Sequence, residues 1–239
     1  MDLSIVDLSP VPEGGTAAEA YANTVEAAQQ AEALGYSRFW VAEHHGMADT
    51  LAGTTPEVLL GHLASETESI RLGSGAVLLN HYSPFKVAEV FGALDALAPG
   101  RIDAGLGRAN GSPAVDRALG TERHVRNPDK DHAEKIEAVV NHLYDDYPSE
   151  HAYSDLEIPS SGEETPAPWV LGSSPSSAAL AGELGLPYCF AAFIRPQFAA
   201  PAFEKYREAF EPSRLAGGID EPHGMVAVNA VCAETDEAA

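Results

Sequence analysis

The chain has 239 residues, and 45% of them are hydrophobic, so a single domain spanning residues 1–239 can bury a large core. Its 14 basic and 36 acidic residues give a formal net charge of −22, a field that repels nucleic acids and anionic membranes and so excludes functions that bind them. The acidic residues are spread along the chain, as in proteins adapted to high salt, and the lack of a basic signal region or an apolar run of roughly 18 residues predicts a cytoplasmic protein.

Apolar strand-like runs alternate with helical stretches in chain order. The pattern predicts a strand at residues 3–8, a helix at 16–34, a strand at 38–44, a helix at 56–68, a strand at 71–79, a helix at 84–97 and a strand at 101–108. It continues with a loop, a helix at 131–144, a proline-rich loop at 148–166, a strand at 169–172, a helix at 176–184, a strand at 188–193, a helix at 198–210 and a strand at 225–232. Apolar strands separated by helices indicate a parallel sheet covered on both faces. Seven such strands, with no GxGxxG motif at the first turn, favour a TIM-type (β/α)8 barrel over an open doubly wound sheet.

The last residues predict that this barrel is incomplete. Thr235 is a candidate N-cap and is followed by two acidic residues, as in a first helical turn, but the chain stops at Ala239. A helix this short is not stable by itself. We therefore expect a barrel truncated at its C-terminus after the seventh strand, whose open edges make the protein unstable or self-associating.

The second predicted strand ends in Glu43, His44 and His45, which the barrel prediction places at the mouth. Neighbouring residues on a strand point to opposite faces, so the two histidines are poorly placed to hold one metal ion. Only one of them can face the mouth, and Glu43 and His45 are expected to support it from the opposite face. We therefore predict no metal site and disfavour a metal-dependent barrel hydrolase.

Other nucleophiles fit the pattern poorly. The lysines fall on predicted helices or their flanks, whereas a Schiff-base barrel enzyme needs a lysine on a strand. Cys189 and Cys232 lie inside apolar runs, far from any CxxC spacing, and are predicted to be buried, reduced thiols. No GxSxG elbow is present.

Two neighbouring strand ends carry features that bind anions. Arg108 emerges at the mouth after Gly105 and Gly107, which allow close backbone approach, and it supplies a fixed positive charge in a chain with few basic residues. The next strand runs into LGSSPSSAAL, where several serines precede a helix N-terminus, the usual form of a phosphate cradle. A surface ion pair for Arg108 and ordinary N-capping by one serine remain open as alternatives.

In combination and in order, several stretches resemble the bacterial luciferase-like family of flavin-dependent monooxygenases. They are FWVAEHHG, IRLGSGAVLLNHYSPFKVAE, LDALAPGRIDAGLGRA, VLGSSPSSAALAGELGLPYCFA and VAVNAVCAETDEAA. The resemblance implies a barrel that binds reduced FMN at its C-terminal mouth. His44 matches the first histidine of the EHH motif, which is implicated in catalysis, and Gly75 and Ala76 match a non-proline cis peptide that supports the flavin ring.

The phosphate end of the flavin is implied by the same resemblance. Arg108 matches the arginine that contacts the flavin phosphate, and Ser174 and Ser177 match hydroxyl positions of the phosphate loop. Ser173 falls where luciferase itself carries an acid, so this contact is expected to differ. The anion site inferred from the residues and the site implied by the resemblance coincide.

The resemblance implies an enzyme that uses reduced FMN and O2 to oxygenate a small organic substrate, with the reduced flavin supplied by a separate flavin reductase. Two alternatives stay open: a non-catalytic flavin-binding or truncated remnant protein, and an oxidoreductase that uses the deazaflavin F420. A homodimer is a further expectation, because relatives often pair through helices near the second and third strands. His81, Tyr82, Asn110 and Phe193 are candidate pocket residues, although packing or loop structure is the better-supported interpretation of each.

Overall fold

A computed structural model describes residues 2–108, 112–119, 128–162, 164–235 and 237–239. Its strands are β1 Ser4–Asp7, β2 Arg38–Val41, β3 Arg71–Ser74, β4 Val77–Leu78, β5 Ile102–Gly107, β6 Ala167–Gly172, β7 Tyr188–Ala191 and β8 Gly224–Ala227. All pairings are parallel, in the order β1-β2-β3-β5-β6-β7-β8, with β4 paired to β5. The sheet forms a nearly closed barrel, because among the described residues its first and last strands, β1 and β8, are not paired with each other. This confirms the predicted fold class.

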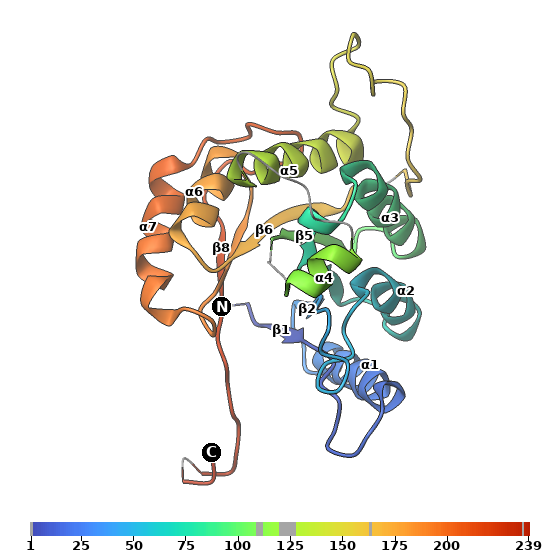
Figure 1. The fold of residues 1–239 in the computed structure, drawn as a ribbon, viewed down its shortest axis with the longest axis vertical. Coiled ribbons are helices and arrows are strands. Elements are labelled where there is room, and N and C mark those ends of the chain that lie inside the picture. The colour runs from blue at the N-terminus through green and yellow to red at the C-terminus, as the bar shows by residue number, and fades with distance from the viewer. Residues whose placement is uncertain (1, 109–111, 120–127, 163, 236) are drawn as a thin grey trace.

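The helices are α1 Ala17–Ala33, α2 Pro56–Glu66, α3 Pro84–Leu97, α4 Pro113–Ala118, α5 Pro128–Tyr144, α6 Pro175–Glu183 and α7 Ala199–Ala209, with 3-10 turns η1 Leu79–His81 and η2 Pro196–Phe198. The longer helices lie around the outside of this barrel, and the short α4 lies in front of its centre in the view of Figure 1. Within the described ranges, no helix has the length and apolar character needed to cross a membrane.

Local sequence signals explain where the helices begin. Thr16 and Glu19 form a capping box at α1, in which the Thr16 hydroxyl accepts from the Glu19 N–H and the Glu19 carboxylate accepts from the Thr16 N–H at 2.7 Å. The first helical residue of α2, α3 and α6 is a proline, whose missing N–H costs nothing there. Gly35 ends α1 with a φ of 78°, a conformation that glycine adopts without strain.

The core has two parts. A large apolar layer fills the space between sheet and helices and includes Phe39, Leu60 and Phe91, each of them completely buried. A smaller cluster lies inside the barrel, where Trp40 and Trp169 meet edge to face with ring centroids 5.7 Å apart. Gly73 needs to be glycine, because a Cβ there would come within 2.4 Å of the Trp40 ring.

Several predicted boundaries were wrong. The strand predicted at 71–79 is split into β3 and β4 around Gly75 and Ala76, and the strand predicted at 38–44 ends at Val41. The predicted loop after β5 contains helix α4, which Ser112 and Pro113 begin and whose signal was overlooked: the Ser112 hydroxyl accepts from the Val115 N–H. Residues 120–127, in the same connection, lie outside the described residues.

The C-terminal predictions also need correction. The strand predicted at 225–232 ends at Ala227, because its partner β7 ends opposite, at Ala191. Cys232, predicted to be buried, is exposed, whereas Cys189 is buried as predicted. Among the described residues after Thr235, which are 237–239, no helix is assigned, although the Thr235 hydroxyl accepts a hydrogen bond from the Ala238 N–H in the manner of an N-cap.

Candidate active site

The carboxyl ends of parallel strands lie together at one end of the barrel, here called the mouth. Four of these ends carry predicted site residues: His44 follows β2, Gly75 and Ala76 follow β3, Arg108 follows β5 and Ser174 follows β6. Because β5 and β6 are neighbours, Arg108 and Ser174 leave adjacent strands. The bond between Gly75 and Ala76 is cis, as the resemblance predicted.

Glu43 is the centre of the polar contacts at the end of β2. Its carboxylate is buried and accepts hydrogen bonds from His45 Nε2 at 2.6 Å, from the Tyr82 hydroxyl at 2.7 Å and from the Leu78 N–H at 2.9 Å. Burial and the hydrogen bond to Glu43 raise the pKa of Tyr82. Since Leu78 lies in β4, beyond the cis bond, Glu43 ties the end of β2 to the segment that follows that bond.

His44 is half-buried, and its backbone N–H donates to the Gly53 carbonyl at 2.7 Å. Its Nδ1 atom is buried and has no hydrogen-bond partner among the described residues. Burial lowers the pKa of His44, the neighbouring His45 lowers it further, and Glu43 opposes both effects. The imidazole is therefore neutral near pH 7, with an unpaired ring nitrogen.

The other candidate pocket residues differ in their surroundings. His81 meets His45 edge to face at 5.7 Å, and burial lowers its pKa. Tyr82 is held by Glu43. Phe193 lies after β7 with 38% of its surface exposed. Asn110 lies outside the described residues.

Arg108 forms the surface ion pair that remained open as an alternative. Its guanidinium lies 2.7 Å from the Asp129 carboxylate at the start of α5, with side chains 34% and 71% exposed. A pair this exposed contributes little free energy, so an anion at the mouth can compete for the guanidinium. The same arginine faces His132, whose pKa is lowered to about 4, mainly by burial and secondly by Arg108.

The serines of the β6–α6 turn are largely bonded to one another. Ser174 caps α6 by accepting from the Ser177 N–H, and the Ser177 hydroxyl donates to the Ser174 carbonyl at 2.8 Å. Tyr188 in β7 adds a hydroxyl 3.0 Å from the Ser177 hydroxyl. N-capping is thus what Ser174 does, at a helix N-terminus that opens at the mouth beside the strand carrying Arg108.

Two residues near the site were missed by sequence reasoning. Lys135 and His132 lie one turn apart on α5, and Lys135 Nζ donates to the Leu79 carbonyl at 3.1 Å. The sequence predicts only that Lys135 lies on a helix, whereas the structure shows that its side chain is 15% exposed. In the part of the chain that the structure describes, no group of three His, Cys, Asp or Glu residues is arranged to hold a metal ion.

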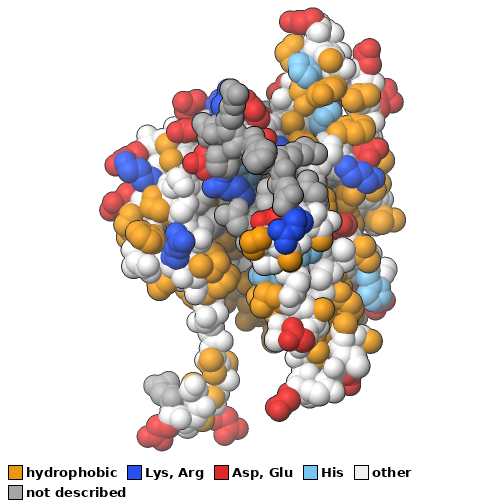
Figure 2. Space-filling view, viewed as in Figure 1, with side chains coloured by type: hydrophobic (Ala, Val, Ile, Leu, Met, Phe, Trp, Pro, Cys, Tyr) orange, Lys and Arg blue, Asp and Glu red, His pale blue; other side chains and the backbone are white. Residues whose placement is uncertain are grey.

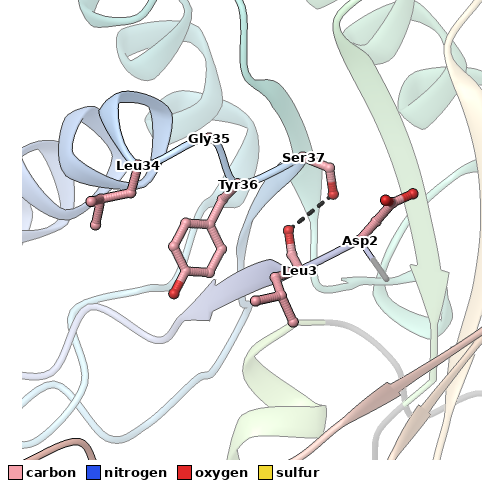
Figure 3. A pocket seen from close by; sticks show the side chains of 6 residues that line it. All are labelled: Asp2, Leu3, Leu34, Gly35, Tyr36 and Ser37. Atoms are coloured by element: carbon pink, nitrogen blue, oxygen red, sulfur yellow. Dashed lines mark hydrogen bonds between the residues drawn. The ribbon is translucent and has the colours of Figure 1, made fainter.

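An open pocket lies at the other end of the barrel (Figure 3). Its residues precede β1 and β2: Asp2, Leu3, Leu34, Gly35, Tyr36 and Ser37. The Ser37 hydroxyl donates to the Leu3 carbonyl at 3.0 Å across it. None of the predicted site residues lines this pocket, so it is separate from the mouth.

Comparisons with known proteins bear on the family and the fold of the chain. The family model described as luciferase-like monooxygenase matches residues 1–239. An N-acetyl-S-alkylcysteine monooxygenase of Bacillus subtilis is 44% identical over 227 residues, which are 95% of this chain and 66% of that protein. The crystal structure of apo-MsnO8 is 42% identical with a TM-score of 0.82, over 94% of this chain and 65% of that one. The chain therefore spans about two thirds of the length of these relatives.

More distant structures share the fold. The oxygenating constituent of 3,6-diketocamphane monooxygenase from Pseudomonas putida, solved with FMN, has a TM-score of 0.71 at 23% identity, over 87% of this chain and 62% of that one. An F420-dependent secondary alcohol dehydrogenase, solved with an F420-acetone adduct, has a TM-score of 0.66 at 18% identity, over 89% of this chain and 66% of that one. Barrels of this shape thus occur with either cofactor.

Proposed function

The chain belongs to the luciferase-like monooxygenase family, and from this premise we propose that it binds reduced FMN at the barrel mouth and uses O2 to oxygenate a small organic substrate. The observation that carries the proposal is the meeting of four strand ends, which bring His44, the cis bond at Gly75, Arg108 and the α6 N-terminus to one end of the barrel.

The residues present fit this cofactor. Arg108 offers a guanidinium whose ion pair with Asp129 is exposed, and the N-terminus of α6 next to it favours negative charge, so together they suit a phosphate. The buried and unpaired Nδ1 of His44 suits a ring with hydrogen-bonding groups, because such a ring supplies the missing partner. Ser174 and Ser177 would contribute their backbone N–H groups and hydroxyls near the phosphate.

When bound, reduced FMN supplies the electrons that activate O2. The protein's own contribution is to bind the phosphate through Arg108, to hold the ring beside the cis bond between Gly75 and Ala76, and to move a proton at His44. A neutral imidazole is the form that accepts a proton, and burial keeps His44 in that form at pH 7.

The proposal also names partners. A separate flavin reductase in the cytoplasm would deliver the reduced flavin, and two chains would associate as a homodimer. Small thioethers are the first substrates to test, because the relative that is 44% identical is an N-acetyl-S-alkylcysteine monooxygenase.

The test is an oxygenation assay in which a flavin reductase supplies reduced FMN and a panel of N-acetyl-S-alkylcysteines is offered. We expect substrate-dependent O2 consumption and a product one oxygen heavier, with a rate about 10²- to 10⁴-fold lower in His44→Ala. His62→Ala, which alters an exposed histidine on α2, serves as the matched control. If wild type and His44→Ala both release only hydrogen peroxide and form no product from the thioethers or from a wider panel, the protein is a non-catalytic flavin binder.

An oxidoreductase that uses F420 is the second candidate, favoured by the shared barrel of the F420-dependent alcohol dehydrogenase. Equilibrium titration of the same protein with FMN and with F420 separates the two. Tenfold tighter binding of F420 decides for this candidate.

A further inference from the structure

The segment that carries His44 is held on both sides by one buried carboxylate. Glu43 precedes His44 and His45 follows it, and the two side chains are joined by the 2.6 Å hydrogen bond from His45 Nε2 to Glu43 Oε1. The Glu43 side chain is 1% exposed and the His45 side chain 16% exposed, so the bond is largely shielded from water.

The same carboxylate reaches across to the next part of the mouth. Its Oε2 accepts from the Leu78 N–H in β4, and its Oε1 also accepts from the hydroxyl of Tyr82, which caps η1. Three donors satisfy the hydrogen-bonding capacity of the carboxylate. Two of them are distant in sequence, because Glu43 lies 35 residues before Leu78 and 39 residues before Tyr82. It therefore joins β2 to the segment that follows the bond between Gly75 and Ala76.

These contacts also fix a tautomer. A carboxylate only accepts, so His45 must carry a hydrogen on Nε2, and in the neutral ring Nδ1 is then the acceptor. His81 lies against the same imidazole edge to face, which restricts its rotation. His44, between the two clamped residues, has its backbone N–H held by Gly53.

We propose that Glu43 is a positioning residue, which holds His44 at a fixed place relative to the Gly75–Ala76 bond through its contacts with His45, Tyr82 and β4. An effect of Glu43 on turnover rests on the proposed function. The positioning of His44 by Glu43 does not, because it concerns the protein without cofactor.

The variant Glu43→Gln keeps the shape of the side chain, but an amide offers one accepting oxygen and adds an NH2 group. It cannot accept from His45, Tyr82 and Leu78 together. Ring ¹⁵N NMR of histidine-labelled protein without cofactor reports the tautomer of each imidazole, and His45→Gln assigns the His45 signals. We expect wild type to show His45 as the Nε2–H form with a strongly downfield ring proton, and Glu43→Gln to lose that shift and to move the His44 titration to lower pH.

Glu32→Gln is the matched control. Glu32 also accepts from three N–H groups, those of Glu68, Ser69 and Ile70, but it does so at the end of the barrel away from the mouth. Burial raises its pKa, and these hydrogen bonds outweigh burial and lower it to about 2. We expect Glu32→Gln to lower the urea midpoint of unfolding, because it weakens hydrogen bonds to a charged group, and to leave the histidine spectrum unchanged.

Turnover supplies the second readout. In the oxygenation assay, Glu43→Gln is expected to lower kcat about 10- to 100-fold, with the KM for reduced FMN within threefold of wild type. Should Glu43→Gln fail to fold, Tyr82→Phe keeps the carboxylate and removes one donor, and it should shift the His45 ring proton and lower kcat about threefold or more. Unchanged histidine spectra in whichever of these variants folds overturn the proposal. So does an altered spectrum with an unchanged kcat, whereas a wild type without turnover refutes only the proposed function.

Discussion

At the scale of single residues, His44 combines two properties that suit proton transfer at the mouth. Its Nδ1 is buried without a partner in the described structure, and burial lowers the pKa of the ring from 6.5. Because the folded pKa lies below 6.5, the neutral imidazole persists at pH values where a free histidine is already half-protonated.

The lowered pKa of His44 predicts the pH profile of turnover. Activity is expected to fall on the acid side with a midpoint below pH 6.5, because protonation removes the accepting form of His44. Rates measured from pH 4.5 to 8 with saturating reduced FMN locate the midpoint, and His44→Ala should abolish the acid limb along with most of the rate. A midpoint above 6.5, or the same limb in His44→Ala, contradicts the assignment.

His132 predicts a pH effect on stability. Its folded pKa is about 4, against 6.5 for a free ring, because burial and Arg108 both disfavour the charged form. Between these values the unfolded chain binds the proton and the folded chain does not, so stability is full above pH 6.5 and is lost as the pH falls toward 4, by up to about 3 kcal/mol. Denaturant titrations at pH 7 and pH 4.5 should show a smaller loss in His132→Gln than in wild type, and equal losses argue against this origin.

Individual residues were predictable from sequence where a local rule or the family resemblance applied, and the cis bond between Gly75 and Ala76 is a case of the second kind. A strand end at the mouth identified Glu43, His44 and His45, and the serines identified a helix N-terminus. The sequence analysis predicts that His44 and His45 point to opposite faces because side chains alternate along a strand. That reason does not apply, because β2 ends at Val41 and both histidines follow it. The contacts of Glu43 with Leu78 and Tyr82 cross two segments distant in sequence, and no local pattern encodes such a meeting.

At the scale of elements, one buried carboxylate joins three neighbouring strands. Asp103 in β5 is completely buried and accepts from Arg38 of β2 at 3.1 Å and from Arg71 of β3 at 2.8 Å. Arg38 also lies over the Trp169 ring of β6 at 5.3 Å. Removing the carboxylate leaves two cations against the barrel interior without their partner.

We therefore predict that Asp103→Asn lowers the free energy of unfolding by about 3–5 kcal/mol, the usual cost of breaking a buried ion pair. Urea unfolding followed by tryptophan fluorescence measures the change. Asp49→Asn, at an exposed position, is the control and should change stability by less than about 0.5 kcal/mol. A loss below 1 kcal/mol in Asp103→Asn contradicts the joining role.

Hydrophobic periodicity was enough to predict which segments are helices and which are strands. Where a strand ends depends on its neighbouring strand, and the periodicity of one segment does not contain that information. β8 ends at Ala227 because β7 offers no partner beyond Ala191, although the apolar run in the sequence continues. Gly111 and Pro113 favour a loop at the position of the short α4, whereas Ser112 as N-cap and Pro113 at N1 are helix start signals. The seven predicted strands, in contrast, all correspond to strands of the structure, and the split of the third one into β3 and β4 gives the eighth.

At the scale of the whole molecule, the net charge of −22 acts on every conformation. Figure 2 shows acidic side chains distributed over the visible face rather than gathered in one patch. Their mutual repulsion destabilises the compact state, and salt screens it as the Debye length falls from about 10 Å at 0.1 M to about 3 Å at 1 M.

We predict that Tm rises by roughly 2–8 °C between 0.1 M and 2 M KCl, because about 1–2 kcal/mol of repulsion is screened and each kcal/mol shifts Tm by about 2–4 °C at this chain length. Scanning fluorimetry in KCl and in NaCl measures the shift, with sucrose as an uncharged control. A Tm that stays constant or falls with both salts argues against adaptation to high salt.

The most direct test of the account is flavin binding at the mouth, measured by equilibrium titration with reduced FMN and with reduced riboflavin, which lacks the phosphate, under anaerobic conditions at high salt. Wild type is predicted to bind FMN more tightly than riboflavin. Arg108→Ala should weaken FMN binding about tenfold or more and leave riboflavin binding unchanged, and Arg207→Ala, an exposed arginine on α7, should match wild type. Failure of wild type to bind reduced FMN, or equal FMN affinity in wild type and Arg108→Ala, would contradict the placement of the flavin at this mouth.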